Sequence, residues 1–474
     1  MESWLNWEWA STGTGVDSGI NIKSEVLIAN DGRNALSAQW ATEGNNYPAV
    51  FLHGVIGWGE AAPLLGELHY FGGARQNILD DLRSVGYKAS MGPLSSNWER
   101  ACEAFAQITG SLTDYGLARS TRFGHNRYGS DYSVRPALVP DFLAAITSRD
   151  TVVSKSFAEN PTEGDENEPE NSRSKINLVG HSQGGPTMRM LVHLLRFGFQ
   201  EEIDACVAAQ VECSPLFWTN RTSSHVNAVF AISGAHQGSV FSDYLSANGD
   251  FLKVYKDFIA ALIAGDLSLV HVYDLQLQHW GLEQNPDESF LTFIDRVFSD
   301  PWVDSKSNAL FDLMVSSVSS PLLSFVQNDP DVTYFSAAGL TTNWRDGIAV
   351  AQLSTFPPFI PIADIVGSYS NGSLAALSAY SPEDWRMSDA MVSIASSRGP
   401  LSGYNSFSMD MQSSSVADLA ASAPVNSPPK GIYNYVGAWN HTDHAALIGA
   451  FDVVPGIRKN FYRNIMTIVT ALSP

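Results

Sequence analysis

The sequence predicts an α/β protein in which helices cover both faces of a mainly parallel sheet. Short apolar segments of strand character alternate with segments whose apolar residues repeat at helical spacing, and this alternation is typical of parallel sheets. The strands expected are 48–52, 175–179, 226–232, 332–337 and 433–436. Hydrophobic residues make up 44% of the 474 residues, which is enough for a large core. No internal repeat is visible, so we expect one elaborated domain over residues 47–474 after an N-terminal extension, residues 1–46.

Amphipathic helices are expected between these strands. Apolar residues at helical spacing follow residue 184, and a second such run presents one apolar face from Phe251 to Ile263. Shorter patterns predict a helix that starts at Ile78 and ends near Gly86, and a last helix that starts near Gly456.

The distribution of charge limits the possible partners. The chain has a formal net charge of −21 and no run rich in Lys or Arg, so we expect no nucleic acid as a partner. Residues 156–173 are strongly acidic and almost without aliphatic side chains. Because such a segment cannot bury enough apolar surface to fold, we expect a solvated, disordered insertion there.

Cysteine usage and hydropathy indicate little about compartment. Cys102, Cys206 and Cys213 show no metal-binding spacing. Cys206 and Cys213 are near enough to bond locally, but the odd number and the absence of a framework argue against dependence on disulfides. No run of eighteen apolar residues predicts a transmembrane helix. The first residues lack the basic and apolar regions of a signal peptide.

The segment Gly180-His181-Ser182-Gln183-Gly184 carries the strongest chemical signal in the chain. It fits the pattern G-x-S-x-G, follows the apolar strand at 175–179 and precedes a helical pattern. Strand, tight turn and helix form the context of a nucleophile elbow, in which the turn strains the serine and the glycines keep side chains away. The pentapeptide alone is a weak signal, but its context makes Ser182 the candidate nucleophile of an α/β-hydrolase fold.

A serine nucleophile needs a base, an acid behind that base, and donors for the oxyanion. In α/β-hydrolases the chain order is serine, acid, histidine. His441 and His444 both follow the last strand, and Asp346 and Asp389 both follow the strand at 332–337. Chain order alone therefore decides neither which histidine is the base nor which aspartate is the acid.

Three longer segments resemble the Geobacillus- and Staphylococcus-type lipases. They are FLHGVIGWG at 51–59, GPLSSNWERACEA at 92–104 and HSQGG at 181–185, with shorter matches at 272–274, 280–282 and 367–369. The match runs with gaps from about residue 47 to the C-terminus and omits the acidic insertion. The resemblance implies an α/β-hydrolase fold with a helical lid over an acyl pocket, and about residues 240–270 match the lid.

The resemblance also implies which residues act. It carries the nucleophile onto Ser182. The family's acid lies four residues after a Trp, which selects Asp389 over Asp346, and its base follows an Asp, which selects His444 over His441. The expected oxyanion donors are the backbone N–H groups of Val55 and Gln183.

The sequence departs from the family at a zinc site that the family builds from two Asp and two His. The matching positions are Glu99, Arg119, His125 and Ser307. Because an arginine cannot ligate zinc, we expect no metal there. We predict instead an ion pair between Glu99 and Arg119, with His125 as a third member.

The family's calcium site is altered as well, since Ala446 stands two residues after the expected base, where the family has an acid. Asp452 is a candidate for a second calcium ligand, but it does not replace the missing acid at position 446. We therefore expect neither metal and no other cofactor.

Together these features predict a serine carboxylic-ester hydrolase that acts on lipids with medium or long acyl chains, in contact with a lipid–water interface. Polyester or lactone hydrolysis and acyl transfer are alternatives on the same triad. A catalytically inactive hydrolase fold used as a binding protein is an alternative from another class. The resemblance favours secretion.

Overall fold

The computed structural model describes residues 45–59, 68–74, 78–81, 86–148, 175–248, 274–370, 381–401, 403–406, 428–449, 459–470 and 472. Its centre is a seven-stranded sheet in the order β12-β13-β9-β8-β7-β1-β4, and every pairing in that sheet is parallel. The strands are β1 (Ala49–Leu52), β4 (Gly86–Ala89), β7 (Ile176–His181), β8 (Val226–Ile232), β9 (Thr333–Leu340), β12 (Tyr404–Ser406) and β13 (Tyr433–Asn440). The predicted α/β fold with its parallel sheet is confirmed.

The two central strands explain why the sheet needs cover on both faces. β7 and β8 are buried along their whole length, and their side chains alternate between the two faces of the sheet. Leu178 belongs to one hydrophobic cluster, whereas its neighbour Val179 belongs to the other. The same alternation separates Phe51 from Leu52 in β1. Two cores therefore form, one on each face.

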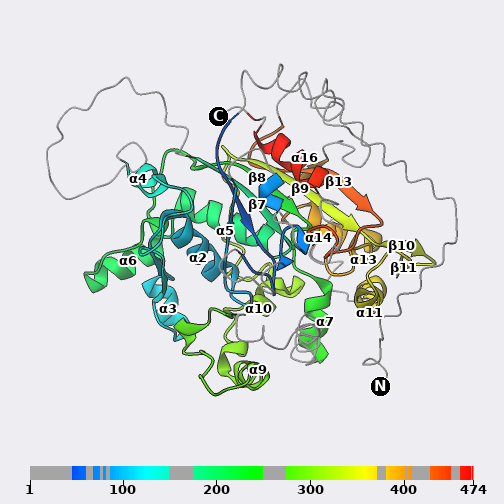
Figure 1. The fold of residues 1–474 in the computed structure, drawn as a ribbon, viewed down its shortest axis with the longest axis horizontal. Coiled ribbons are helices and arrows are strands. Elements are labelled where there is room, and N and C mark those ends of the chain that lie inside the picture. The colour runs from blue at the N-terminus through cyan, green and yellow to red at the C-terminus, as the bar shows by residue number, and fades with distance from the viewer. Residues whose placement is uncertain are drawn as a thin grey trace.

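Helices from distant parts of the chain close these two cores. On one face lie α2 (Asn97–Thr109), α4 (Phe142–Thr147) and α5 (Gly184–Phe197), and on the other lie α9 (Phe290–Ser299) and α16 (Lys459–Thr470). Figure 1 shows α2 and α5 on the opposite side of the sheet from α16. The start of α2 is fixed by a capping box between Ser96 and Glu99.

The remaining elements lie around this centre. The helices are α3 (Leu117–Phe123), α6 (Gln200–Ala209), α7 (Val240–Asn248), α10 (Ala309–Leu313), α11 (Ile360–Ser368), α13 (Pro382–Arg386) and α14 (Ile394–Arg398). Three antiparallel hairpins pair β2 (Leu68–His69) with β3 (Gly73–Ala74), β5 (Leu112–Asp114) with β6 (Tyr128–Asp131), and β10 (Thr342–Arg345) with β11 (Ile348–Ala351).

One prediction needs correction. In the helix expected from Ile78 to about Gly86, the described residues Ile78–Asp81 form a 3-10 turn, η1, and Gly86 begins β4. Cys206 and Cys213, which the sequence placed near enough to bond locally, do form a disulfide. After α6 the chain turns back, so that Cys213, seven residues beyond Cys206, lies with its Cα atom 5.6 Å from that of Cys206. This is within the range that a disulfide spans.

Several predicted features lie outside the described residues. They are residues 1–44 of the expected extension over 1–46, the acidic insertion at 156–173, and all of the candidate lid beyond α7, including the helix expected at 251–263. Within the described ranges, no helix is both long and apolar enough to cross a membrane.

Candidate active site

Ser182 lies in the tight turn between β7 and α5, as predicted for a nucleophile elbow. Its φ of 57° is in the left-handed region that side chains rarely adopt, so the turn holds the residue under strain. Gly184 makes the turn possible, because a Cβ at that position would lie 2.3 Å from the carbonyl oxygen of Leu52 on β1. The neighbouring strand thus requires glycine here and holds Ser182 at the end of the sheet.

His444 and Asp389 meet at the carboxyl ends of the strands that precede them. Nδ1 of His444 lies 2.7 Å from Oδ2 of Asp389, and the backbone N–H of His444 donates to the carbonyl of Asp389 at 2.9 Å. The other oxygen of Asp389 accepts from the N–H groups of Met391 and Val392 at 3.1 and 2.8 Å. With 0% of its surface exposed, Asp389 is held in one orientation behind the imidazole.

The two rejected alternatives lie elsewhere. Asp346 is exposed in the turn between β10 and β11. His441 is exposed, whereas Asp443 and His444, two and three residues later, are buried. The structure brings His444 and Asp389 together and places neither alternative in that contact.

The loop after β1 presents one of the two expected oxyanion donors. The carbonyl of Gly54 accepts from Nδ1 of His53 at 2.8 Å and from the N–H of Gly57 at 3.1 Å. Because a trans peptide is planar, holding this carbonyl also fixes the opposite direction of the Val55 N–H. Among the described residues, neither the N–H of Val55 nor that of Gln183 has a hydrogen-bond acceptor. Both are available to an oxyanion.

The tautomer of His53 follows from its second contact. The backbone N–H of Met91 donates to Nε2 of His53 at 3.0 Å, so the ring carries its proton on Nδ1 and donates it to Gly54. Burial, together with the charge of Arg100, holds the pKa of His53 well below its usual value. The ring is therefore neutral at physiological pH and acts as a fixed donor to the loop.

Sequence reasoning missed Arg100, which ties three segments of the site together. Its side chain is fully buried and donates to the carbonyl of His53, to the carbonyl of Gly92 at 2.8 Å and to Oγ1 of Thr187 at 3.1 Å. Thr187 lies on the first turns of α5, immediately after the nucleophile. One arginine thereby links the oxyanion loop to the nucleophile helix. In the sequence, the one indication of this role was that Arg100 lies within the segment GPLSSNWERACEA, which carries the family resemblance.

The positions that match the family's zinc ligands form a cluster without a metal ligand set. Oγ of Ser307 donates to Oε1 of Glu99 at 2.9 Å and accepts from Arg119 at 3.1 Å. Within the described part of the chain, Glu99 and Arg119 make no direct ion pair, so the predicted pair is corrected to one bridged by a hydroxyl. Nε2 of His125 lies 4.0 Å from Glu99, and Nε2 of His279, which the sequence analysis did not select, lies 3.8 Å from it.

These residues do not fit a zinc ion. No group of three His, Cys, Asp or Glu side chains in the described ranges is arranged to hold a metal. Burial alone would raise the pKa of Glu99, but the neighbouring side chains of His279, His125 and Arg119 outweigh it and lower that pKa. Arg119 is the permanently charged member of this group, and it reaches Glu99 through the hydroxyl of Ser307.

Near the position of the family's calcium site, the carboxylate of Asp443 binds the protein backbone. The backbone N–H of Ala446 donates to Oδ1 of Asp443 at 2.9 Å, and the N–H of Phe356 donates to Oδ2 at 2.8 Å. Asp443 therefore uses both oxygens on the protein backbone. Asp452 lies outside the described residues.

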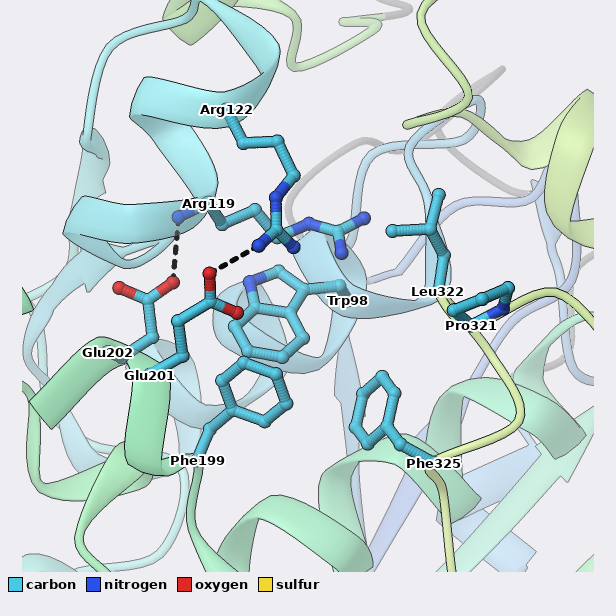
Figure 2. Close-up of a pocket in the computed structure, with 9 residues that line it drawn as sticks. All are labelled: Trp98, Arg119, Arg122, Phe199, Glu201, Glu202, Pro321, Leu322 and Phe325. Carbon is cyan, nitrogen blue, oxygen red and sulfur yellow. Dashed lines mark hydrogen bonds and ion pairs between the residues drawn. The ribbon is translucent and has the colours of Figure 1, made fainter. Parts of the chain in front are cut away.

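Arg119 also lines a pocket of about 440 Å³ beside α2, α3 and α6, which includes none of the expected catalytic residues. Figure 2 shows its side chain extending over Trp98, with Phe199, Phe325 and Leu322 around the pocket. The guanidinium carbon lies 5.0 Å from the centre of the Trp98 ring. Aromatic contact thus holds the arginine in addition to its bond with Ser307.

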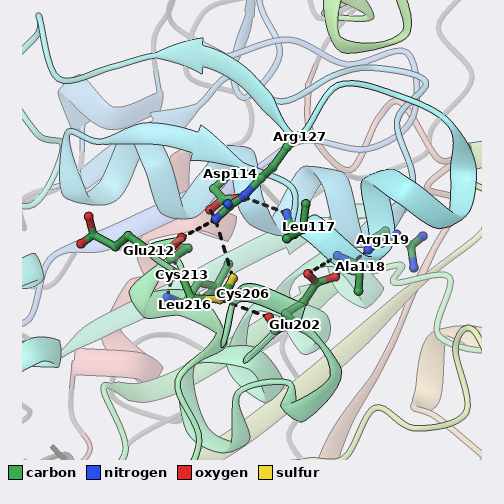
Figure 3. The surroundings of a disulfide bond; sticks show 12 residues. Asp114, Leu117, Ala118, Arg119, Arg127, Glu202, Cys206, Glu212, Cys213 and Leu216 are labelled. Carbon is green, nitrogen blue, oxygen red and sulfur yellow. Dashed lines mark hydrogen bonds and ion pairs between the residues drawn. A yellow bond between two sulfur atoms is a disulfide. The ribbon is translucent and has the colours of Figure 1, made fainter. Parts of the chain in front are cut away.

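The helix that carries Arg119 is anchored next to the disulfide (Figure 3). The carboxylate of Glu202 on α6 accepts from the backbone N–H groups of Ala118 and Arg119 at 2.7 and 2.8 Å, which caps the first turn of α3. Cys206 follows Glu202 by one turn of α6 and is bonded to Cys213. The disulfide therefore restrains the element that caps α3.

The sequence matches the family described as "Lipase-like, C-terminal domain" over residues 45–141 and 165–451. The chain belongs to this lipase-like family. The resemblance noted from the sequence is confirmed by relatives in Staphylococcus. A lipase of Staphylococcus epidermidis is 29% identical over 382 residues, which are 80% of this chain and 48% of that protein. Lipase 2 of Staphylococcus aureus is 30% identical over 75% of this chain and 45% of its own.

Solved structures agree with this membership. The structure of EstA from Clostridium botulinum superposes with a TM-score of 0.70 and 30% identity, covering 91% of this lipase-like chain and 88% of EstA. The Staphylococcus hyicus lipase gives a TM-score of 0.65 at 25% identity, covering 90% and 96%. The α/β-hydrolase fold is thereby confirmed. The chain spans about half the length of the curated Staphylococcus relatives that it matches.

Proposed function

We propose that this protein hydrolyses carboxylic esters through an acyl-enzyme formed on Ser182. The observation that carries the proposal is the 2.7 Å contact between His444 and the buried carboxylate of Asp389, in a chain whose Ser182 lies at a strained elbow. A base oriented by a carboxylate is the arrangement that activates a serine hydroxyl. Relatives named lipase and EstA support the same class of reaction.

In the first half of the reaction, Oγ of Ser182 attacks the ester carbonyl while Nε2 of His444 takes the hydroxyl proton. His444 then gives this proton to the leaving alcohol, and the acyl group remains on Ser182. In the second half, His444 deprotonates a water molecule that attacks the acyl carbonyl, and the proton returns to Ser182 as the acid leaves. Asp389 stays ionised throughout and stabilises the imidazolium.

The charge that develops on the carbonyl oxygen would be held by the N–H groups of Val55 and Gln183. Both lack an acceptor within the described ranges, so neither has to break a bond first. Donors that are fixed before the reaction stabilise the transition state without a reorganisation cost.

Lipids with medium or long acyl chains are the proposed substrates, with about residues 240–270 as the lid and contact with a lipid–water interface. We also propose secretion, and the Cys206–Cys213 disulfide agrees with an oxidising compartment. Hydrolysis rates on esters of graded acyl length test the substrate class. Formation of a new ester when an acceptor alcohol is added would indicate acyl transfer, and release of hydroxy acids would indicate a polyester or lactone hydrolase.

The direct test of the triad is Ser182→Ala with Ser133→Ala, an exposed serine, as control. Ester hydrolysis and labelling by a fluorophosphonate should both fall to background in Ser182→Ala and stay unchanged in Ser133→Ala. Retention of a tenth of the activity by Ser182→Ala would show that the nucleophile is elsewhere. Failure of the unmodified protein to label would favour an inactive, ligand-binding hydrolase fold.

A further inference from the structure

Tyr70 lies in direct contact with the oxyanion loop, although no sequence motif pointed to it. Its side chain is 6% exposed and its ring packs edge-on against Trp58, with 5.4 Å between the ring centres. A Cβ added to Gly54 would lie 2.8 Å from Oη of Tyr70 and 2.7 Å from Cβ of Ser182. The tyrosine hydroxyl and the nucleophile thus both lie against one glycine.

The direction of each hydrogen bond at this hydroxyl can be deduced. The backbone N–H of Gly54 donates to Oη of Tyr70 at 2.9 Å. Oη also lies 2.8 Å from Nδ1 of His181. We assign the hydroxyl proton to that nitrogen, because this gives both buried atoms a hydrogen-bond partner while Oη accepts from Gly54. His181 therefore accepts on Nδ1 and carries its ring proton on Nε2.

His181 in turn contacts the expected base. It is the last residue of β7, directly before Ser182, and its ring centre lies 4.4 Å from that of His444. Burial and the neighbouring His444 hold the pKa of His181 well below its usual value. The ring stays neutral and adds no second positive charge beside an imidazolium.

We propose that Tyr70 is a positioning residue for the reaction. Its hydroxyl joins the loop of the Val55 donor to His181, and His181 supports the ring of His444. The inference rests on the proposed function, because it assigns Tyr70 a role only if Ser182, His444 and Val55 act as described above. One phenol group thereby fixes two positions in the site, that of the Val55 N–H and that of the His444 ring.

Loss of the hydroxyl has a defined consequence. In Tyr70→Phe the ring and its packing remain, but the N–H of Gly54 loses its acceptor and Nδ1 of His181 loses its donor. Both groups are buried, so each must move toward another partner. Movement of Gly54 displaces the Val55 N–H, and rotation of His181 displaces His444. Binding of the ester in its ground state depends on neither.

The experiment compares Tyr70→Phe with Tyr334→Phe. Tyr334 is a matched control, because its buried hydroxyl also accepts from a backbone N–H, that of Asp329 at 2.8 Å, in the core of the sheet. We expect kcat of Tyr70→Phe to fall roughly tenfold or more, with KM changed less than about twofold, whereas Tyr334→Phe keeps its kcat. An unchanged kcat in Tyr70→Phe would overturn the proposal, even if its melting temperature fell.

Two further measurements separate positioning from general loosening. An alkyl boronic acid, whose adduct with serine mimics the tetrahedral intermediate, should bind Tyr70→Phe more weakly by about the same factor as kcat falls. His181→Asn combined with Tyr70→Phe should cost less than the product of the two single effects, because the two side chains share one hydrogen bond. Multiplied losses or unchanged boronate affinity would refute the role of Tyr70. If instead Ser182→Ala stayed active in the same assay, the triad itself would be wrong.

Discussion

Arg119 and Glu99 are joined by the hydroxyl of Ser307, which donates to the carboxylate and accepts from the guanidinium. All three residues are buried, and the cluster connects α2 and α3 with the loop before α10. The resemblance described from the sequence implies a zinc site at this place. Here a permanently charged side chain and a hydroxyl supply the cross-link instead.

The cluster predicts indifference to metal chelators. EDTA should change neither the melting temperature nor the ester hydrolysis rate, and elemental analysis should find no stoichiometric zinc. Arg119→Ala should lower the free energy of unfolding by about 1 kcal/mol or more, because it leaves Glu99 and Ser307 without their buried partner. Arg122→Ala is the control, since its ion pair with Glu201 is about half exposed and should matter little. Stoichiometric zinc would disprove this account.

Asp389→Asn should reduce kcat by several orders of magnitude, up to about 10⁴-fold, because an amide cannot hold the imidazole in the required tautomer or stabilise its charge. The fold should persist, since Oδ1 can still accept from Met391 and Val392. Asp346→Asn, in the exposed turn of the β10–β11 hairpin, should leave kcat unchanged. A larger loss in Asp346→Asn than in Asp389→Asn would mean that the acid has been assigned wrongly.

Glu103 predicts a pH dependence of stability. Burial raises its pKa from 4.5 to about 8, although the N–H of Gly92 donates to it at 2.6 Å. Between about pH 4.5 and pH 8, Glu103 holds a proton in the native state that it has released in the unfolded chain. Glu103 therefore makes the free energy of unfolding fall as pH rises toward 8. Glu103→Gln should therefore raise the melting temperature relative to the unmodified protein at pH 8 and much less at pH 5. Exposed Glu283→Gln serves as control, and an equal difference at both pH values would contradict the assignment.

Leu353 offers a test of contact with a lipid surface. Its side chain is completely exposed, and three residues later the N–H of Phe356 is bonded to Asp443, the residue before His444. Leu353→Ser should lower the rate on emulsified long-chain esters several-fold, because a leucine buried in lipid contributes roughly 1.5–3 kcal/mol. The rate on soluble short-chain esters should not change. Val134→Ser, also exposed, is the control, and equal behaviour of the two variants would exclude this surface.

Much of the fold could be predicted from the sequence. The short apolar runs identified the central strands, and Val226–Ile232 agrees with β8 residue for residue. The elbow at Ser182 was predictable because strand, glycine turn and helix are contiguous in the chain and follow from local sterics. The pattern at Ile78 misled, since Ile78 belongs to the hydrophobic cluster of Phe51 and Phe71 and Leu79 packs against it, while the described residues Ile78–Asp81 form a 3-10 turn.

The contacts between distant residues depended on the tertiary structure. Nothing local brings Asp389 to His444 across 55 residues or Ser307 to Glu99 across 208, because side chains so far apart meet only when the sheet and its helices are assembled. The roles of Tyr70, Arg100 and His279 come from the atoms that surround them after folding. The sequence by itself thus determined the sheet, the elbow and the candidate residue types. Tertiary packing decided which of those residues touch, since a hydrogen bond needs its two atoms within about 3 Å.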